Sequence, residues 1–164
     1  MPESVYYSRV NSPVGPLLLA VTGRGLVAVE FDRGQVASGW VESAEKTAPC
    51  ARQLEEYFAG RRRGFDLALD LRGTDFQKRC WQELLKIPYG ETRSYADIAR
   101  AIGRPTAVRA VGLANGQNPI AIIVPCHRVI GSDGSLTGYG GGLDIKRKLL
   151  ELEGALSGTL SVPA

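Results

Sequence analysis

The apolar pattern of this chain changes its period near residue 73. Before that point, the short apolar runs VYYSRV, PLLLAV and LVAVEF alternate with the turn-rich stretches NSPVG and TGRG. Such runs predict a small antiparallel sheet over the first 33 residues. Beyond residue 73, apolar residues recur every three or four positions, which is typical of helices. We therefore predict an α+β protein with two domains, residues 1–72 and 73–164.

The remainder of the first domain adds further elements to this sheet. The stretch APCARQLEEYFAG predicts a helix with Leu54, Tyr57 and Phe58 on one side and a stop at Gly60. The stretch FDLALDLRG alternates leucine with polar residues, which favours a strand. The N-terminal domain is thus expected to be a strand-rich structural support with one helix.

The second domain is predicted to be mainly helical. Thr74 and Gln77 form a capping-box pattern that opens a helix, which ends at the Pro88-Tyr89-Gly90 sequence. The stretches TRSYADIARAIG and RPTAVRAVGLANG predict two more short helices, the second beginning at Pro105. Two short helices joined by a glycine-containing turn fit a helix-turn-helix, although many such pairs bind no DNA.

The excess of positive charge lies entirely in the second domain. Residues 1–72 contain nine Lys and Arg and nine Asp and Glu, whereas residues 73–164 contain eleven and eight. This excess suits a partner with phosphates, but three charges alone are weak evidence. No apolar run approaches the roughly 20 residues of a membrane span, and the N-terminus MPESVYYSRV lacks a secretory signal. A cytoplasmic location is therefore expected, with no membrane partner.

The three cysteines, Cys50, Cys80 and Cys126, contain no close pair. An odd and sparse set makes a disulfide framework improbable, and a single histidine adds too few ligands for a zinc site. We predict neither a metal nor a cofactor. Cys80 falls within the apolar stripe of a predicted helix, which favours a role in the core.

Cys126 has a different context, since it follows the apolar run AIIV and Pro125 and precedes His127, the only histidine. The run favours a buried strand, and the proline ends it and leaves the cysteine at the strand edge. An adjacent base is the usual means of making a thiol nucleophilic. Successive side chains of an extended segment point to opposite sides, however, so a bridging water is one alternative to direct contact. On local spacing alone, a structural and a catalytic cysteine both remain open.

The sequence Asn118-Pro119, followed by Pro125-Cys126-His127-Arg128-Val129, resembles the active-site signature of the O6-alkylguanine-DNA alkyltransferases, the methylated-DNA–protein-cysteine methyltransferases. The resemblance extends from about Gly73 to Gly154, through FQKRCWQELLKIPYGETRSYADIA, RAVGLANGQNPI and GYGGGLDIKRKLLELEG. Residues 1–72 are similar to the strand-rich partner domain of the family, but their sequence is less diagnostic. The resemblance implies a DNA repair enzyme that flips O6-alkylguanine, chiefly O6-methylguanine, out of duplex DNA. The alkyl group then passes irreversibly to Cys126, once per molecule.

The resemblance also implies roles for the residues around the cysteine. His127 is expected to deprotonate the Cys126 thiol through a water, while Glu153 orients and charges the histidine. Asn118 is expected to brace the turn around the active site, and Tyr95 to donate a proton towards the departing guanine. Taken alone, Glu153 would be a solvated charge at a helix end and Tyr95 an aromatic packing residue.

Arg109 corresponds to the arginine that enters the DNA stack where the nucleotide has been flipped out. The small residues around Arg109 would let its helix press into the minor groove of double-stranded DNA, whereas without the resemblance they favour packing against another helix. The expected DNA contacts are Arg109, Ala107, Ala110, Thr106, Gly112 and Arg128. The expected pocket for the flipped base is lined by Tyr139, Gly140, Gly141 and Val129. No obligate protein partner is implied.

Two other functions are open to a chain with these features. A DNA-binding module without chemistry would be expected to have lost the cysteine, as some relatives have, but Cys126 is intact. A cysteine hydrolase for small molecules would need a route for turnover, and it gives no reason for the helix-turn-helix or for Arg109. Replacing Cys126 with Ala would separate these functions, because damaged-DNA binding should survive while alkyl transfer disappears.

Overall fold

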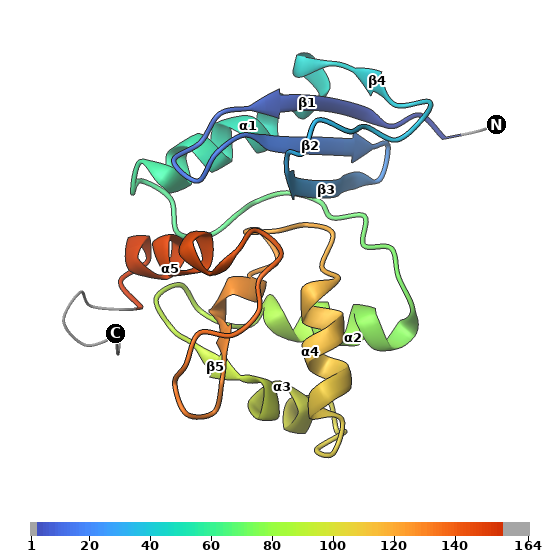
Figure 1. Ribbon diagram of the computed structural model, residues 1–164. Coiled ribbons are helices and arrows are strands. Elements are labelled where there is room, and N and C mark those ends of the chain that lie inside the picture. The colour runs from blue at the N-terminus through green and yellow to red at the C-terminus, as the bar shows by residue number, and fades with distance from the viewer. Residues whose placement is uncertain (1–2, 156–164) are drawn as a thin grey trace. The chain divides into compact units, whose positions relative to one another are not determined.

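The computed structural model describes residues 3–155 (Figure 1). The chain forms two compact units, which are Met1–Arg72 together with Pro119–Ile123, and Gly73–Asn118 together with Val124–Ala164. The architecture is α+β, with a small sheet and one helix in the first unit and mainly helices in the second. No helix within residues 3–155 is long and apolar enough to cross a membrane.

The first unit is built on a four-stranded sheet with the order β3-β2-β1-β4. The first three strands, β1 (Tyr6–Val10), β2 (Leu17–Thr22) and β3 (Gly25–Phe31), form the predicted antiparallel meander. The sequence pattern missed β4 (Val41–Glu42), which pairs with β1 in parallel. A strand of two residues is too short to show any alternation of apolar and polar side chains.

Helix α1 (Ala44–Phe58) packs against β1 and β2. It begins four residues before the predicted helix, because Ser43 acts as its N-cap and accepts a hydrogen bond from Lys46 N at 3.2 Å. Leu54 and Tyr57 of the predicted apolar side are buried, whereas Phe58 is only half-buried. The helix therefore closes the core of the first unit over the leucines of β2.

Two short segments pair with β3 without forming strands. Leu26 pairs with Leu69 from the predicted strand FDLALDLRG, of which only this one bridge forms. A Cβ at Gly25 would lie 2.5 Å from Ala68 O, so only glycine allows this close approach of two backbones. Val29 pairs with Ile120 in the same way. These two segments provide partners for backbone groups of β3.

The predicted buried strand AIIV is wrong. Residues 121–124 form turns, with a hydrogen bond from Ile123 N to Ala121 O at 2.8 Å. Ile122 has φ 74°, a left-handed conformation that is rare and strained for a β-branched residue. All four residues are buried, so their apolar character reflects burial and not extended structure. Residues 119–123 belong with Met1–Arg72, where Ile120 pairs with Val29. The chain returns to the second unit at Val124.

The second unit contains the helices α2 (Asp75–Leu84), α3 (Tyr95–Ala101), α4 (Val108–Gly116) and α5 (Leu143–Leu152). The predicted capping box of Thr74 and Gln77 forms, and Ser94 and Asp97 form a second one at the start of α3. Helices α2, α3 and α4 pack against one another, and the Trp81 indole donates to Ala114 O at 2.9 Å. Helices α3 and α4 follow one another through residues 102–107 and form the predicted pair.

Helix α4 begins three residues later than the sequence indicated. Pro105 and Thr106 lie in a turn closed by a hydrogen bond from Ala107 N to Arg104 O at 2.9 Å. Ala107 has no side-chain group to cap the helix. The turn presents Thr106 to solvent ahead of the helix.

A second, parallel sheet of two short strands connects α3 to the cysteine segment. Strand β5 (Arg93–Ser94) pairs with β6 (Val129–Ile130), so that Arg93 lies opposite Val129. Between Pro125 and β6 lies a 3-10 turn, η1 (Cys126–Arg128). The pairing brings the start of α3, and with it Tyr95, to the segment that contains Cys126.

Candidate active site

Cys126 begins η1 and is buried, with 6% of its surface exposed. Its N–H bonds to Val124 O at 2.8 Å. Two asparagine side chains hold this part of the backbone, Asn118 Nδ2 donating to Val124 O at 2.7 Å and Asn115 Nδ2 to Cys126 O at 3.3 Å. The sequence pattern missed Asn115, since an Asn-Gly pair indicated only the end of a helix. The cysteine is therefore held by side chains from α4 and the chain that follows it.

Burial raises the pKa of the Cys126 thiol, while a hydrogen bond from Asn118 and the positive charge of Lys146 lower it by less. The group is therefore a thiol at rest, and its proton must leave as the sulfur reacts. A nearby base that is itself uncharged at neutral pH would suit this step.

His127 is such a base, and its side chain is fully buried. Its Nε2 lies 2.8 Å from Glu153 Oε2. An ionised carboxylate can only accept a hydrogen bond, so Nε2 carries the proton and Nδ1 holds a lone pair. Nδ1 has no hydrogen-bond partner among the described residues. The imidazole is therefore oriented with a proton-accepting nitrogen left available.

The pKa values of His127 and Glu153 are both lowered, which keeps the imidazole neutral and the carboxylate ionised. Burial lowers the pKa of His127, and the hydrogen bond and charge of Glu153 oppose that shift only in part. Burial by itself would raise the pKa of Glu153, but hydrogen bonds from His127 and Arg128 outweigh burial and lower it to about 2. The resting pair at neutral pH is a neutral imidazole beside an ionised carboxylate.

Arg128 does not fit its predicted role as a DNA contact. Its side chain is buried, and its guanidinium donates to both oxygens of Glu153, from Nε at 2.8 Å and from Nη2 at 2.9 Å. Its Nη1 donates to Ile87 O at 2.7 Å. The resemblance implied a contact with DNA, but these three bonds direct the guanidinium into the protein.

Lys146 on α5 is a buried cation that the sequence pattern did not indicate. Its Nζ donates to Thr137 O at 2.7 Å and to Gly138 O at 3.3 Å, and it lies 5.9 Å from the centre of the Tyr95 ring. Burial lowers the pKa of Lys146 to about 8, and only the thiolate form of Cys126 would oppose the shift. A lysine among the charged residues of an amphipathic helix gives no signal of burial in a sequence.

Tyr95 lies at the first position of α3 beside the loop of residues 131–142. Its hydroxyl donates to Thr137 O and accepts from Thr137 Oγ1, both at 3.2 Å. Gly112 of α4 also faces its ring, where a Cβ would lie 3.8 Å from Tyr95 Cδ1. The tyrosine therefore contacts both the loop and α4.

The predicted base pocket is divided between this loop and β6. Tyr139 and Gly141 are half-buried and Gly140 is exposed, whereas the Val129 side chain is fully buried in β6. Val129 can therefore offer a base only its backbone. Its neighbour in the chain, Arg128, donates hydrogen bonds to the Glu153 carboxylate, which lies outside this loop.

One face of α4 is open to solvent. Arg109 and Ala110 are exposed on it, Gly112 and the preceding Ala107 are partly exposed, and Thr106 is exposed in the turn before it. Val108 and Leu113 add apolar surface that the sequence pattern did not single out, and Leu113 is 65% exposed. Amphipathic periodicity would place such side chains in a core.

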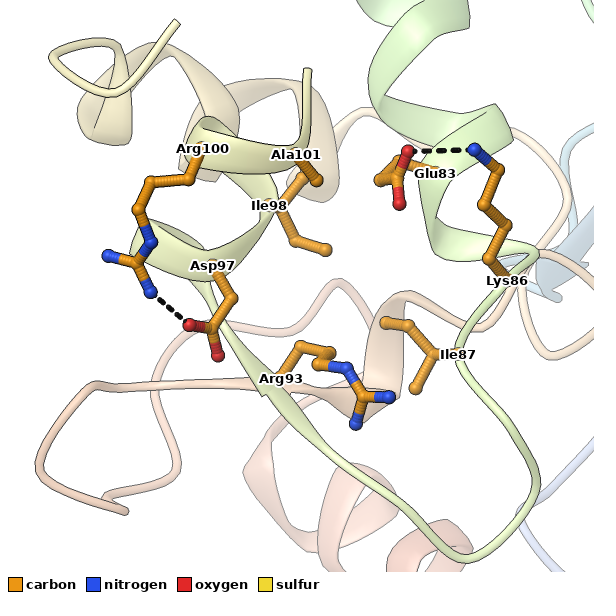
Figure 2. A pocket seen from close by; sticks show the side chains of 8 residues that line it. All are labelled: Glu83, Lys86, Ile87, Arg93, Asp97, Ile98, Arg100 and Ala101. Carbon is orange, nitrogen blue, oxygen red and sulfur yellow. Dashed lines mark hydrogen bonds and ion pairs between the residues drawn. The ribbon is translucent and has the colours of Figure 1, made fainter. Parts of the chain in front are cut away.

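A cavity of about 390 Å³ lies elsewhere in the second unit, between α2, β5 and α3 (Figure 2). Its lining consists of Glu83, Lys86, Ile87, Arg93, Asp97, Ile98, Arg100 and Ala101. The ion pairs Glu83–Lys86 and Asp97–Arg100 stand on opposite sides of it in Figure 2. None of the predicted site residues lines this cavity.

Both units match models of one protein family, each model describing one domain. Residues 75–155 match a family model described as 6-O-methylguanine DNA methyltransferase, DNA binding domain. Residues 5–71 match a second model, 6-O-methylguanine DNA methyltransferase, ribonuclease-like domain. The two matches together cover most of the chain.

Individual relatives are similar over nearly their whole length. A methylated-DNA–protein-cysteine methyltransferase of Methanosarcina barkeri is 56% identical over 153 residues, which cover 91% of this chain and 97% of the relative. The crystal structure of Mycobacterium tuberculosis OGT in complex with DNA is similar with a TM-score of 0.87 and 56% identity, covering 92% of this chain and 93% of that one. A crystal structure of the Mycobacterium tuberculosis O6-methylguanine methyltransferase has a TM-score of 0.86 and 53% identity, covering 98% and 96%.

Proposed function

Since the chain belongs to the 6-O-methylguanine DNA methyltransferase family, it repairs DNA by transferring an alkyl group to one of its own cysteines, and we propose that this cysteine is Cys126. The observation that carries the proposal is that Cys126 is followed in the chain by the buried His127, whose Nε2 lies 2.8 Å from Glu153 Oε2. Cys50 and Cys80 are buried as well, but no such acid–base pair adjoins them.

We propose that the substrate is double-stranded DNA that contains O6-alkylguanine, chiefly O6-methylguanine. The exposed face of α4 would enter the minor groove, with Arg109 taking the place of the flipped nucleotide. The loop of residues 131–142 would receive the base through Tyr139, Gly140 and Gly141. A buried thiol cannot meet a base within the stack, so flipping is a physical requirement of this reaction.

The transfer itself needs one proton acceptor and one proton donor. His127 Nδ1 accepts the thiol proton through a bridging water, and Glu153 stabilises the imidazolium that forms. The sulfur attacks the alkyl carbon, an S–C bond forms, and the C–O6 bond breaks with its electron pair passing to the guanine. The Tyr95 hydroxyl leaves its contact with Thr137 and donates to the base as electron density builds up on it. The imidazolium then loses its extra proton and the tyrosinate regains one through solvent, so the products are guanine and a thioether on Cys126.

The reaction ends with that thioether. A thioether sulfur is a poor leaving group, so the alkyl group stays on the cysteine. Each molecule therefore acts once, as a stoichiometric reagent. We place this activity in the cytoplasm, because it needs both DNA and a reduced thiol.

The test is to mix the protein with duplex DNA that carries one O6-methylguanine, digest it with trypsin and weigh the peptides. Cleavage after Arg109 and Arg128 isolates Cys126 in the fragment Ala110–Arg128, apart from Cys50 and Cys80. We expect one added methyl group on this fragment, saturating at one per protein. A folded, reduced protein that binds the damaged duplex and leaves the fragment unmodified would instead be a damage-binding module. Repeated hydrolysis of an unrelated ester would favour a hydrolase.

A further inference from the structure

Each nitrogen of the Arg128 guanidinium donates a hydrogen bond to another residue of the second unit. Two of its three nitrogens, Nε and Nη2, hold the Glu153 carboxylate in a bidentate pair, and the third, Nη1, donates to Ile87 O. The side chain also lies beside the Tyr89 ring, 5.8 Å from its centre. Planar, bidentate pairing with a carboxylate is the geometry that arginine provides and lysine does not.

The turn of residues 87–90 closes over the same carboxylate residue. The Tyr89 hydroxyl donates to Leu152 O at 3.3 Å, next to Glu153 at the end of α5. Gly90 has φ 85°, and a Cβ there would lie 3.2 Å from Glu153 O. Arg128 is bound to this turn through Ile87, so one arginine links the turn, η1 and the end of α5.

Arg128 and His127 share one oxygen of Glu153. Oε2 accepts from Arg128 Nη2 at 2.9 Å and lies 2.8 Å from His127 Nε2. The Glu153 and His127 side chains are both fully buried, so solvent does not screen these contacts. The carboxylate therefore faces a positive charge on one side and an imidazole on the other.

We propose that Arg128 is a positioning residue for the alkyl transfer, because it fixes the Glu153 oxygen against His127 Nε2 and neutralises the carboxylate, leaving the imidazole uncharged with Nδ1 as its proton acceptor. This inference rests on the proposed function. A carboxylate without its guanidinium would stabilise the imidazolium more strongly, and an imidazole that is already protonated cannot accept the thiol proton.

The charges around His127 agree with this role. Burial is the main cause of its lowered pKa, and the charges of Arg128 on η1 and Lys146 on α5 lower it further. Glu153 acts in the opposite direction. Removal of Arg128 leaves the carboxylate dominant, so the pKa of His127 should rise.

The wild-type protein allows a first test without any substitution. The chain has one histidine, so the ring-nitrogen signals of a ¹⁵N-histidine-labelled sample belong to His127. At pH 7 we expect a neutral ring with the proton on Nε2. An imidazolium, or a neutral ring protonated on Nδ1, at that pH would overturn the proposal. The reading does not depend on alkyl transfer, so it stands apart from a failure of the proposed function, which an inactive wild-type protein would show.

The second test compares Arg128→Met with Arg128→Lys in single-turnover transfer from methylated duplex between pH 5.5 and 9. We expect the acidic midpoint of the rate profile to rise by about one pH unit or more in Arg128→Met, since an opposite charge commonly shifts a pKa by that amount. Arg128→Lys keeps a positive charge, and its midpoint should shift by less. The matched control is Arg100→Met, which removes an arginine from the exposed pair with Asp97 and should leave the midpoint unchanged.

A purely structural role predicts a different outcome. A folded Arg128→Met or Arg128→Lys protein that is slower by the same factor at every pH, with the wild-type midpoint and histidine signals, would refute the proposal. If Arg128→Met does not fold, the rate profile of Arg128→Lys and the wild-type histidine spectrum can still refute the proposal.

Discussion

The second unit contains two regions of opposite design, the buried cluster around Cys126 and the exposed face of α4. In the cluster, His127, Glu153 and Arg128 are fixed by bonds of 2.8–2.9 Å to one another. On α4, Arg109 is exposed, and no hydrogen bond or ion pair joins its side chain to another described residue. Burial strengthens electrostatic interactions, whereas solvent weakens them.

We interpret this difference as a division between the proposed alkyl transfer at Cys126 and the proposed DNA recognition by α4. Proton transfer needs groups whose position and charge are set before the substrate arrives, and burial provides both. A surface that follows a DNA groove needs small side chains and an arginine that is not committed within the protein. The two regions should therefore respond differently to substitution.

The largest expected effect is the complete loss of alkyl transfer in Cys126→Ala, with binding to methylated duplex retained. The matched control is Cys50→Ala in the first unit, where burial alone raises the thiol pKa to about 12 and keeps that cysteine inert. We expect full stoichiometric transfer in the control. Methyl incorporation and a gel-shift titration measure the two properties. Residual incorporation by folded Cys126→Ala would mean that another cysteine is the acceptor.

Arg109→Ala tests whether the exposed face serves recognition only. Transfer from methylated duplex should slow by on the order of tenfold to a hundredfold. Flipping a base costs a few kcal/mol, and the variant lacks the side chain that would take the place of the flipped nucleotide. Alkylation of Cys126 by iodoacetamide, which needs no DNA, should keep its wild-type rate. Arg52→Ala on the exposed side of α1 removes the same charge and should change neither rate. An equal fall in both rates would remove the distinction between the two regions.

The smallest expected effect is a loss of stability in mild acid that arises from the buried cluster. The pKa of His127 in the folded protein lies below its ordinary value of 6.5, so as the pH falls through 6.5 the unfolded chain takes up a proton that the folded chain does not. The free energy of unfolding should then decrease by at most about 1.4 kcal/mol per pH unit. Below 4.5, Glu153 adds to the decrease, because its folded pKa is about 2.

Denaturant titrations from pH 7.5 to 4.5 measure this effect, and His127→Gln is the matched control. Since the chain has one histidine, the variant should show an almost flat profile between pH 6.5 and 5. A wild-type profile that is equally flat in this range would contradict the lowered pKa of His127.

The sequence by itself determined the features that depend on neighbouring residues. The capping box at Thr74 formed as predicted, because it needs only a backbone N–H and a side chain three residues away. The meander of β1–β3 followed from apolar runs and turns. The roles of Cys126, His127 and Glu153 were named from the family resemblance, and the structure brings His127 and Glu153 together.

Only the tertiary structure decided the features that depend on distant residues. Arg128 and Glu153 are 25 positions apart, so no local pattern indicates that the arginine turns inward to the carboxylate and not outward to the surface. Ile122 takes a left-handed conformation against its β-branched preference, in a buried turn that no local pattern indicates. Lys146 belongs to a helix with an ordinary charged sequence, and its burial is known only once the loop carbonyls of Thr137 and Gly138 are placed. Burial and long-range pairing are properties of the assembled fold, and in this protein they set the charges around the reactive thiol.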